Sequence, residues 1–152
     1  MIHEEWITNV LTNRPDLTRR QLDTTRDRMN QAFPDALVRG FEPIIPTLTL
    51  PDSDDRHILA CAIYARADLI VTINLTDFPL DALIPQAIAA AHPDAFVDYL
   101  FAVEEEEALA AIAKMRKRLR APSMTPKEFI ESIGQVGMPL TASRLRGSLT
   151  RI

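Results

Sequence analysis

The 152-residue chain has one cysteine, four glycines and no long apolar run, and each of these scarcities excludes a class of protein. A lone cysteine cannot form an internal disulfide, which excludes a disulfide-stabilised secreted scaffold. Cys61 stands between two alanines in an apolar helical run, a setting typical of a small core residue in a reducing compartment. Eleven prolines against four glycines exclude a collagen-like or glycine-rich flexible chain.

Signals for membranes and secretion are also missing from the sequence. No stretch of about 20 apolar residues could span a bilayer. The first residues, Met-Ile-His-Glu-Glu-Trp, lack the cationic and apolar parts of a signal peptide. We therefore expect a cytoplasmic protein without a membrane partner. Hydrophobic residues at 47% and charged residues at 25% are typical of a globular protein with a sizeable core.

Charge is distributed unevenly along the chain. Residues 1–113 hold 8 Lys and Arg against 19 Asp and Glu, whereas residues 114–152 hold 9 against 2. The net charge of −4 thus combines an acidic body with a basic C-terminal piece. Such a piece could contact nucleic-acid phosphates, although a solvated helix face is the commoner reason for a charge run. The candidate RNA-binding residues are Lys114, Arg116, Lys117, Arg118 and Arg120.

Apolar periodicity and capping residues predict an alternation of helices and short strands over the first hundred residues. The expected helices lie at residues 2–11, 18–33, 52–66 and 92–101, and the expected strands at residues 36–38, 68–73 and 87–90. The run from Asp68 to Ile73 is continuously apolar and β-branched, as expected of a buried parallel strand. This succession favours an α/β domain with a parallel sheet over residues 1–103.

The remaining residues, 104–152, predict a helical extension. Its expected helices lie at residues 104–119, 125–133 and 139–149. Thr125 is a suitable N-cap for the second of these helices, and Glu128 three residues later completes a capping box.

Polar side chains gather at two places where chemistry is expected. Asp52, Asp54 and Asp55 stand at a helix start, and Asn74 and Asp77 follow the strand that ends at residue 73. In parallel sheets the loops beyond the carboxyl ends of the strands form the ligand site. Carboxylates that converge there could hold Mg²⁺ or Mn²⁺, although each acid alone is more often a helix cap or a turn residue.

Three segments together resemble a known family. Asp55-Arg-His-Ile-Leu-Ala-Cys-Ala-Ile63, followed by Leu69-Ile-Val-Thr-Ile-Asn-Leu-Thr-Asp-Phe78, is similar to the second half of a PIN domain, the nuclease fold of many bacterial toxin–antitoxin toxins. Ile2-His-Glu-Glu-Trp6 resembles the family's helix with a glutamate before a bulky apolar residue. The resemblance implies a three-layer α/β sandwich with a parallel sheet, followed by a C-terminal helical extension.

The resemblance also implies a metal-dependent endoribonuclease, in which acidic residues hold Mg²⁺ or Mn²⁺ and water attacks an RNA phosphodiester. Carried over by position, the implied metal ligands are Glu5, Asp55 and Asp77, with Glu4 as the fallback for Glu5. Asn74 stands where the family pattern has an acid, and would orient water or phosphate as a further catalytic residue. Thr72 in the preceding strand would help to position the substrate.

One family feature is missing ahead of these motifs. PIN domains begin with a short apolar strand that ends in an aspartate, whereas here an uncapped helix begins at the second residue. The resemblance therefore predicts a PIN-like domain that is incomplete at its N-terminus. Two functions stay open: a toxin-like ribonuclease that an antitoxin protein would bind, and a catalytically degenerate module that binds RNA or protein. An unpaired sheet edge would also favour a homodimer.

Overall fold

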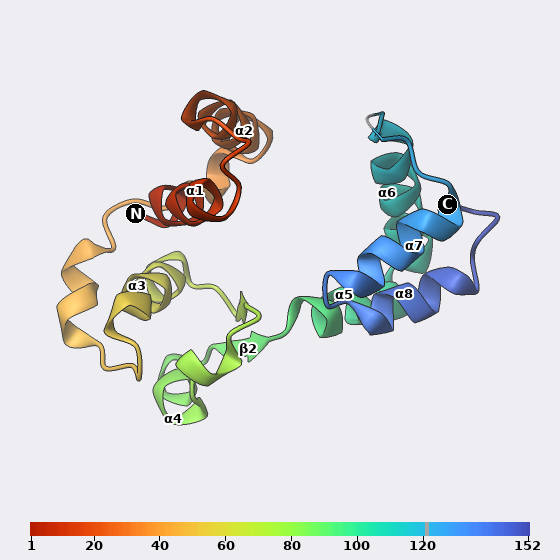
Figure 1. The fold of residues 1–152 in the computed structure, drawn as a ribbon. Helices are drawn as coiled ribbons and strands as arrows, with labels where there is room; N and C mark the ends of the chain where they lie inside the picture. The colour runs from red at the N-terminus through yellow and green to blue at the C-terminus, as the bar shows by residue number, and fades with distance from the viewer. Residues whose placement is uncertain (121) are drawn as a thin grey trace. The chain divides into compact units, whose positions relative to one another are not determined.

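The computed structural model describes residues 1–120 and 122–152. The chain is mostly helical and divides into two compact units, which are described separately (Figure 1). The N-terminal unit comprises residues 1–70 and 76–89, and the helical unit comprises residues 71–75 and 90–152. The domain boundary expected between residues 103 and 104 stays a prediction. The two compact units are groups of residues in mutual contact and need not coincide with domains.

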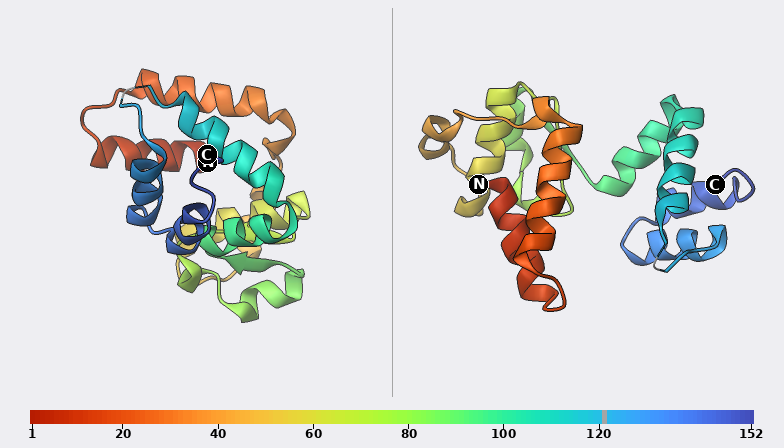
Figure 2. Two further views of the ribbon diagram at one scale, coloured as in Figure 1. Left: turned by 90° about the vertical axis from the view of Figure 1, so that its right-hand side faces the viewer. Right: turned by 90° about the horizontal axis from the view of Figure 1, so that it is seen from above.

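Local capping sets the first helices of the N-terminal unit. Helix α1 (Ile2–Asn13) begins without a side-chain cap, as its sequence indicated. Helix α2 (Arg19–Ala32) begins after the N-cap Thr18, whose hydroxyl accepts the Gln21 N–H while the Gln21 side chain accepts the Thr18 N–H. The two helices pack against each other as a hairpin, which Figure 2 shows from two further sides.

The second half of the N-terminal unit carries α3 (Arg56–Ala65), which follows the 3₁₀ turn η3 (Ser53–Asp55). Asp52 caps this turn by accepting the Asp54 N–H. Helix α3 packs against the 3₁₀ segment η2 (Glu42–Thr47) and buries Leu59 and Ala60. The unit is completed by η1 (Pro34–Ala36), η4 (Leu75–Asp77), which enters it at residue 76, α4 (Leu80–Leu83) and η5 (Ile84–Gln86).

Cys61 lies on α3 and is partly buried, and burial raises the pKa of its thiol. Cys61 was expected to be a small core residue, and the structure leaves it only partly buried.

The sheet consists of two short strands in the described part of the chain, β1 (Leu69–Val71) and β2 (Ala89–Ala91). They run parallel, because the Ala89 N–H donates to the Asp68 carbonyl at 2.9 Å and the Thr72 N–H donates to the Ala91 carbonyl at 3.0 Å. An α/β chain with a parallel pair is therefore confirmed, whereas a three-layer sandwich is not.

Two strand predictions need correction. The strand expected at residues 36–38 is wrong: Pro34–Ala36 forms η1, because the fixed φ of a proline at the first position suits a helical turn. The strand expected at residues 68–73 is shorter than predicted. Its Ile70 is 5% exposed, but Ile73 is 78% exposed, because a strand paired on one edge is covered over only part of its length.

The helical unit contains α5 (Pro93–Val103), α6 (Glu105–Arg118), α7 (Pro126–Gln135) and α8 (Pro139–Arg146). Helix α8 packs against α5 and α7, and α5 also packs against α6. The capping box of Thr125 and Glu128 at the start of α7 is confirmed. The buried core of the unit consists of Phe101, Leu109, Ala113, Ile130, Ala142, Leu145 and Ile152.

A buried carboxylate ties α5 to α8. Asp94, which is 3% exposed, accepts the N–H groups of Leu140 and Thr141 at 2.8 Å each, and the Thr141 hydroxyl at 2.7 Å. Helix α8 has no cap from its own N-cap residue, Met138, so this distant carboxylate fills that role. His92 caps α5 by accepting the Asp94 N–H.

None of the helices in the described residues combines the length and the apolar character that a membrane span requires.

Candidate functional site

Asp55 is the centre of a group of acidic side chains in the N-terminal unit. It ends η3 and is the N-cap residue of α3. Burial raises the pKa of Asp55, and a hydrogen bond with the Asp77 carboxyl group and the charges of Asp77, Asp52 and Glu5 raise it further. Since two carboxylates in hydrogen-bond contact repel each other when both are ionised, a proton or a cation between them stabilises the pair. We call Glu5, Asp52, Asp55 and Asp77 the acidic cluster.

The structure separates the two adjacent glutamates of α1. Glu4 forms an ion pair with Arg19, whose Nη2 lies 2.7 Å from Glu4 Oε2, and Arg26 Nη1 lies 3.8 Å from Glu4 Oε1. Glu5 Oε2 lies instead 2.9 Å from Nε2 of His57, on the first turn of α3. Of the two candidates, Glu5 is therefore the one beside Asp55, and its role as a metal ligand stays a prediction.

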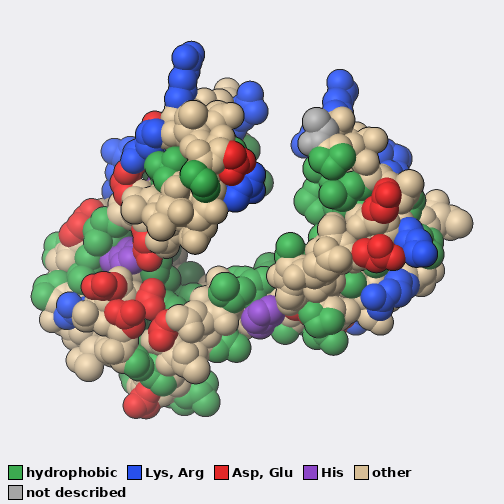
Figure 3. Space-filling view, viewed as in Figure 1, with side chains coloured by type: hydrophobic (Ala, Val, Ile, Leu, Met, Phe, Trp, Pro, Cys, Tyr) green, Lys and Arg blue, Asp and Glu red, His purple; other side chains and the backbone are tan. Residues whose placement is uncertain are grey.

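His57 is a hydrogen-bonded histidine at the border of the acidic cluster. It is 8% exposed, and its Nδ1 lies 2.6 Å from the carbonyl oxygen of Asp54. His57 is thus held by the backbone of the turn that precedes α3. In Figure 3, acidic side chains gather over the part of the N-terminal unit that carries α3, beside a histidine.

The donor set of the acidic cluster fits Mg²⁺ or Mn²⁺ in kind, because every donor is a carboxylate oxygen. Asp55 and Asp77 already meet, and Glu5 is near enough to act on the pKa of Asp55. Among the residues described, however, no three His, Cys, Asp or Glu side chains are arranged as a ready metal site. The cluster is thus a pair of joined carboxyl groups, Asp55 and Asp77, with two further acids, Asp52 and Glu5, close by.

Thr72 and Asn74 belong to the helical unit in the division of the chain. The Asn74 N–H donates to the Thr72 hydroxyl at 3.1 Å, which orders the turn after β1. Their predicted roles in catalysis and substrate positioning rest on the family resemblance.

The five basic candidates of α6 and the segment after it differ in their surroundings. Arg116 is partly buried, and its Nη1 donates to the Met124 carbonyl at 2.8 Å, so it anchors the segment that leads to α7. Its Nε is buried without a hydrogen-bond partner in the described residues. The other four are exposed and form no ion pair within the described chain: Lys114, Lys117, Arg118 and Arg120.

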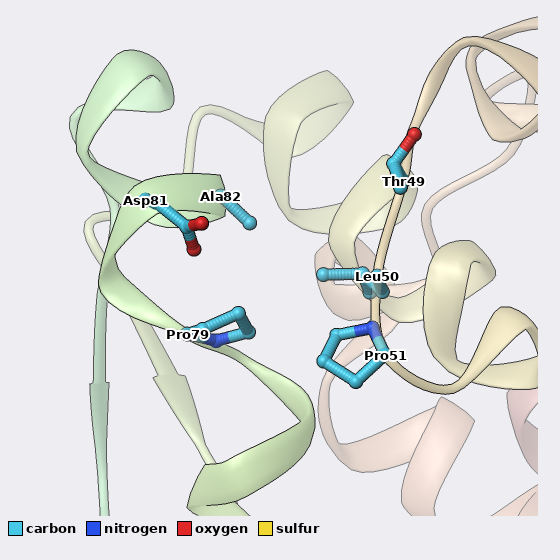
Figure 4. A pocket seen from close by; sticks show the side chains of 6 residues that line it. All are labelled: Thr49, Leu50, Pro51, Pro79, Asp81 and Ala82. Carbon is cyan, nitrogen blue, oxygen red and sulfur yellow. The ribbon is translucent and has the colours of Figure 1, made fainter.

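The N-terminal unit also contains a pocket of about 450 Å³ beside α4 (Figure 4). Pro79, Asp81 and Ala82 line one side of it, and residues 49–51 line the other. Asp81 is the charged side chain among the described lining residues, so the pocket lacks the positive charge that would attract a phosphate. We assign the pocket no part in the candidate site.

Sequence reasoning grouped Asp52 with Asp55 but did not retain Asp52 among the implied metal ligands. It missed the contact of His57 with Glu5. The spacing of His57 two residues after Asp55 was the available signal, but the partner on α1 is distant in sequence.

Comparisons with known proteins agree with the motifs. The family described as "VapC50 C-terminal domain" matches residues 93–147, which lie in the helical unit. Over 92 residues the chain is 40% identical to "Putative ribonuclease VapC50" of Mycobacterium tuberculosis, an alignment that covers 60% of this chain and 54% of that protein. The chain is thus similar to a VapC-type protein, and the comparisons support its resemblance to VapC/PIN-type toxins.

The resemblance seen in the sequence is thereby confirmed. The chain spans about half the length of the curated relative that it matches. No solved structure matches the chain.

Proposed function

We propose that this protein is a metal-dependent endoribonuclease of a toxin–antitoxin system, with Glu5, Asp55 and Asp77 as the ligands of Mg²⁺ or Mn²⁺. The observation that carries the proposal is the hydrogen-bonded pair of Asp55 and Asp77, in which the pKa of Asp55 is raised. A divalent cation would relieve the repulsion of this pair more strongly than a single proton does. The printed name of the relative, a ribonuclease, supports the same activity.

In this proposal the protein's own residues have the following roles. The carboxylates of Asp55 and Asp77 hold the cation, and Glu5 contributes a third oxygen ligand from α1. The cation, when bound, lowers the pKa of a water molecule and polarises a phosphate oxygen. Asn74 and Thr72 keep the roles that the resemblance implies, orienting water or phosphate through an amide and a hydroxyl group.

A second candidate function is a catalytically degenerate module that binds RNA or protein without cleaving it. One observation favours it: in the described residues no three acidic, histidine or cysteine side chains are arranged to hold a metal. Asn74 also adds no negative charge at the position where the family pattern has an acid.

The proposal extends to partners and location. RNA is the substrate, an antitoxin protein is the regulator, and a homodimer is the expected assembly. A cytoplasmic location goes with an RNA substrate and with the lone cysteine.

Cleavage of RNA by the purified protein tests the proposal. We expect cleavage in the presence of Mn²⁺ or Mg²⁺, loss of cleavage with EDTA, and a fall of at least about 100-fold for Asp55→Asn, because one charged ligand is removed. Asp81→Asn, the same substitution at an exposed acid of α4, serves as the matched control and keeps the activity.

The outcomes separate the two candidate functions. Asp55→Asn cleaving as fast as the wild type would overturn the ribonuclease proposal. RNA binding without cleavage at any Mn²⁺ concentration would favour the degenerate module instead.

A further inference from the structure

The helical unit contains a pocket of about 240 Å³ that the proposed function does not use. Helix α7 contributes Lys127, Ile130 and Glu131 to the lining. Arg146 at the end of α8 and Leu149 in the turn after it complete the described lining. Ile130 is 2% exposed and Leu149 is 42% exposed, so apolar surface extends from the base of the pocket to its rim. We call this the α7–α8 pocket.

Two cations at the rim of the α7–α8 pocket lack an ion pair in the described part of the chain. Lys127 and Arg146 are exposed, and Lys127 forms no ion pair even with Glu131, one turn further along α7. Arg144, the other basic residue of α8, is by contrast already paired with Asp98. With two cations against one acid, the rim carries a net positive charge and attracts a negatively charged occupant.

The size of the pocket and its lining favour one class of occupant. Sites for small molecules usually measure roughly 300–1,000 Å³, so this pocket is suited to one side chain rather than to a whole ligand. Single-stranded RNA is commonly held by stacking its bases on aromatic rings, whereas Ile130 and Leu149 are aliphatic. A peptide can supply a large apolar side chain for the pocket and carboxylates for its rim, and Glu131 can accept a backbone N–H of that peptide.

Contacts elsewhere in the unit hold both walls of the α7–α8 pocket. Helix α7 packs against α8, and Gly134 of α7 lies so near α8 that an added Cβ would be 3.7 Å from the Cβ of Ala142. The first turn of α8 is fixed by Asp94, which accepts the Thr141 N–H. Because the pocket is already formed, a partner binds it without the cost of ordering these helices.

We propose that the α7–α8 pocket is a docking site for an acidic peptide segment of a partner protein, which inserts one large apolar side chain. That side chain packs on Ile130 and Leu149, and carboxylates on either side of it pair with Lys127 and Arg146. The acidic cluster takes no part in this docking, so the inference is independent of the proposed ribonuclease activity.

Binding of a synthetic peptide to the full chain tests the apolar part of this interaction. The probe is a short fluorescein-labelled peptide of Asp and Glu residues with one central leucine, and fluorescence anisotropy measures its Kd. Because burial of a leucine side chain is strongly favourable, we expect the same peptide with a central serine to bind about tenfold more weakly. Equal affinity of the two peptides, or no binding of the leucine peptide, would overturn the inference.

Removal of charge at the rim separates a specific contact from general attraction. We expect Lys127→Ala with Arg146→Ala to weaken binding of the leucine peptide by about five- to tenfold. Lys114→Ala with Lys117→Ala is the matched control, because it removes the same charge from exposed residues of α6 that are not among the described lining residues. The control should change the Kd by less than about twofold. Equal weakening by the two double variants would mean that net charge alone attracts the peptide, which would contradict the proposal.

A third comparison distinguishes a peptide from a nucleic acid. We expect Leu149→Ser to weaken binding of the leucine peptide by about fivefold. Leu140→Ser is its control, because Leu140 is 51% exposed on α8 and is not among the described lining residues. A fluorescein-labelled oligouridine RNA is measured on the same variants, and its affinity should not respond to Leu149→Ser. If the affinity for RNA falls with Leu149→Ser while that for the peptide does not, the pocket holds nucleic acid and the inference is wrong.

Discussion

Asp55 and Asp94 are two carboxyl groups whose pKa values the fold moves in opposite directions. The pKa of Asp55 is raised by burial, by the hydrogen bond with Asp77 and by neighbouring negative charges. The folded protein therefore holds this proton more tightly than the unfolded chain does. As the pH rises above the ordinary value of 3.8, ionisation of Asp55 reduces the stability of the N-terminal unit. A site that gathers negative charge for a cation is destabilised when no cation is bound.

Asp55→Asn is therefore expected to stabilise the protein while it removes activity. The neutral amide can donate to the Asp77 carboxylate without repulsion, so we expect the Tm at pH 7, without metal, to rise by about 1–2 °C. Differential scanning fluorimetry measures this change, with Asp81→Asn as the unaffected control. A lower Tm for Asp55→Asn would show that the Asp55 carboxylate stabilises the fold rather than straining it.

Asp94 shows the opposite behaviour. Burial alone would raise the pKa of Asp94, but the N–H groups of Thr141 and Leu140 and the Thr141 hydroxyl outweigh it and hold the pKa below its usual value. Its stabilising effect is complete above the unfolded pKa of about 3.9 and is lost as the pH falls through the lower pKa of the folded state. The carboxylate thus stabilises the helical unit at neutral pH.

Asp94→Asn tests this cap. The amide offers one acceptor where the carboxylate offers two, so we expect a loss of about 2–3 kcal/mol in the free energy of unfolding at pH 7. Urea denaturation followed by circular dichroism measures the loss. The loss should shrink as the pH falls from about 4, where the unfolded chain becomes protonated, through the lower pKa of Asp94 in the folded protein. Asp98→Asn, on the same helix and paired with Arg144 at the surface, is the control and should have a much smaller effect. Equal effects of the two substitutions would contradict the role of Asp94 as a buried cap.

Among the elements, helices were predictable wherever a local signal marks their start. Thr125 forms the capping box that the sequence indicated, because such a cap involves residues within one turn. The extents of the strands were less predictable, because they depend on a neighbour elsewhere in the chain. The cap of α8 was missed for the same reason: its acceptor, Asp94, is far away in sequence.

The residues of the candidate site also differ in how far their local sequence predicts them. Asp55 and Asp77 could be proposed from their positions at a helix start and after a strand. The resemblance already preferred Glu5 to Glu4, but the physical difference between them lies in their partners, Arg19 for Glu4 and His57 for Glu5. Sequence alone therefore supplied the acids, and tertiary contacts distinguish between neighbours.

At the scale of the whole molecule, the acidic and the basic residues of interest lie in different units of the chain. The acidic cluster lies in the N-terminal unit, where the carboxyl groups are close enough to affect one another. The basic residues follow one another at the end of α6 in the helical unit, and the acidic first turn of the same helix complements its dipole. Lys117 and Arg118 are exposed there without an ion pair in the described residues, whereas Arg116 is used internally. Lys117 and Arg118 are therefore the better candidates for binding phosphate, because the Arg116 side chain already donates to the Met124 carbonyl.

Salt dependence of RNA binding distinguishes a phosphate contact from a solvated helix face. In an Asp55→Asn background, which prevents cleavage, we expect Lys117→Ala with Arg118→Ala to weaken binding of single-stranded RNA. The slope of log K against log salt should become shallower by about 0.7 for each phosphate that the variant no longer neutralises. Fluorescence anisotropy between 50 and about 300 mM salt measures both quantities. Arg144→Ala removes a cation of the same unit that is already paired with Asp98, so it should leave the slope unchanged. If the double substitution also leaves affinity and slope unchanged, the basic end of α6 is a solvated face, and RNA is held by other parts of the protein.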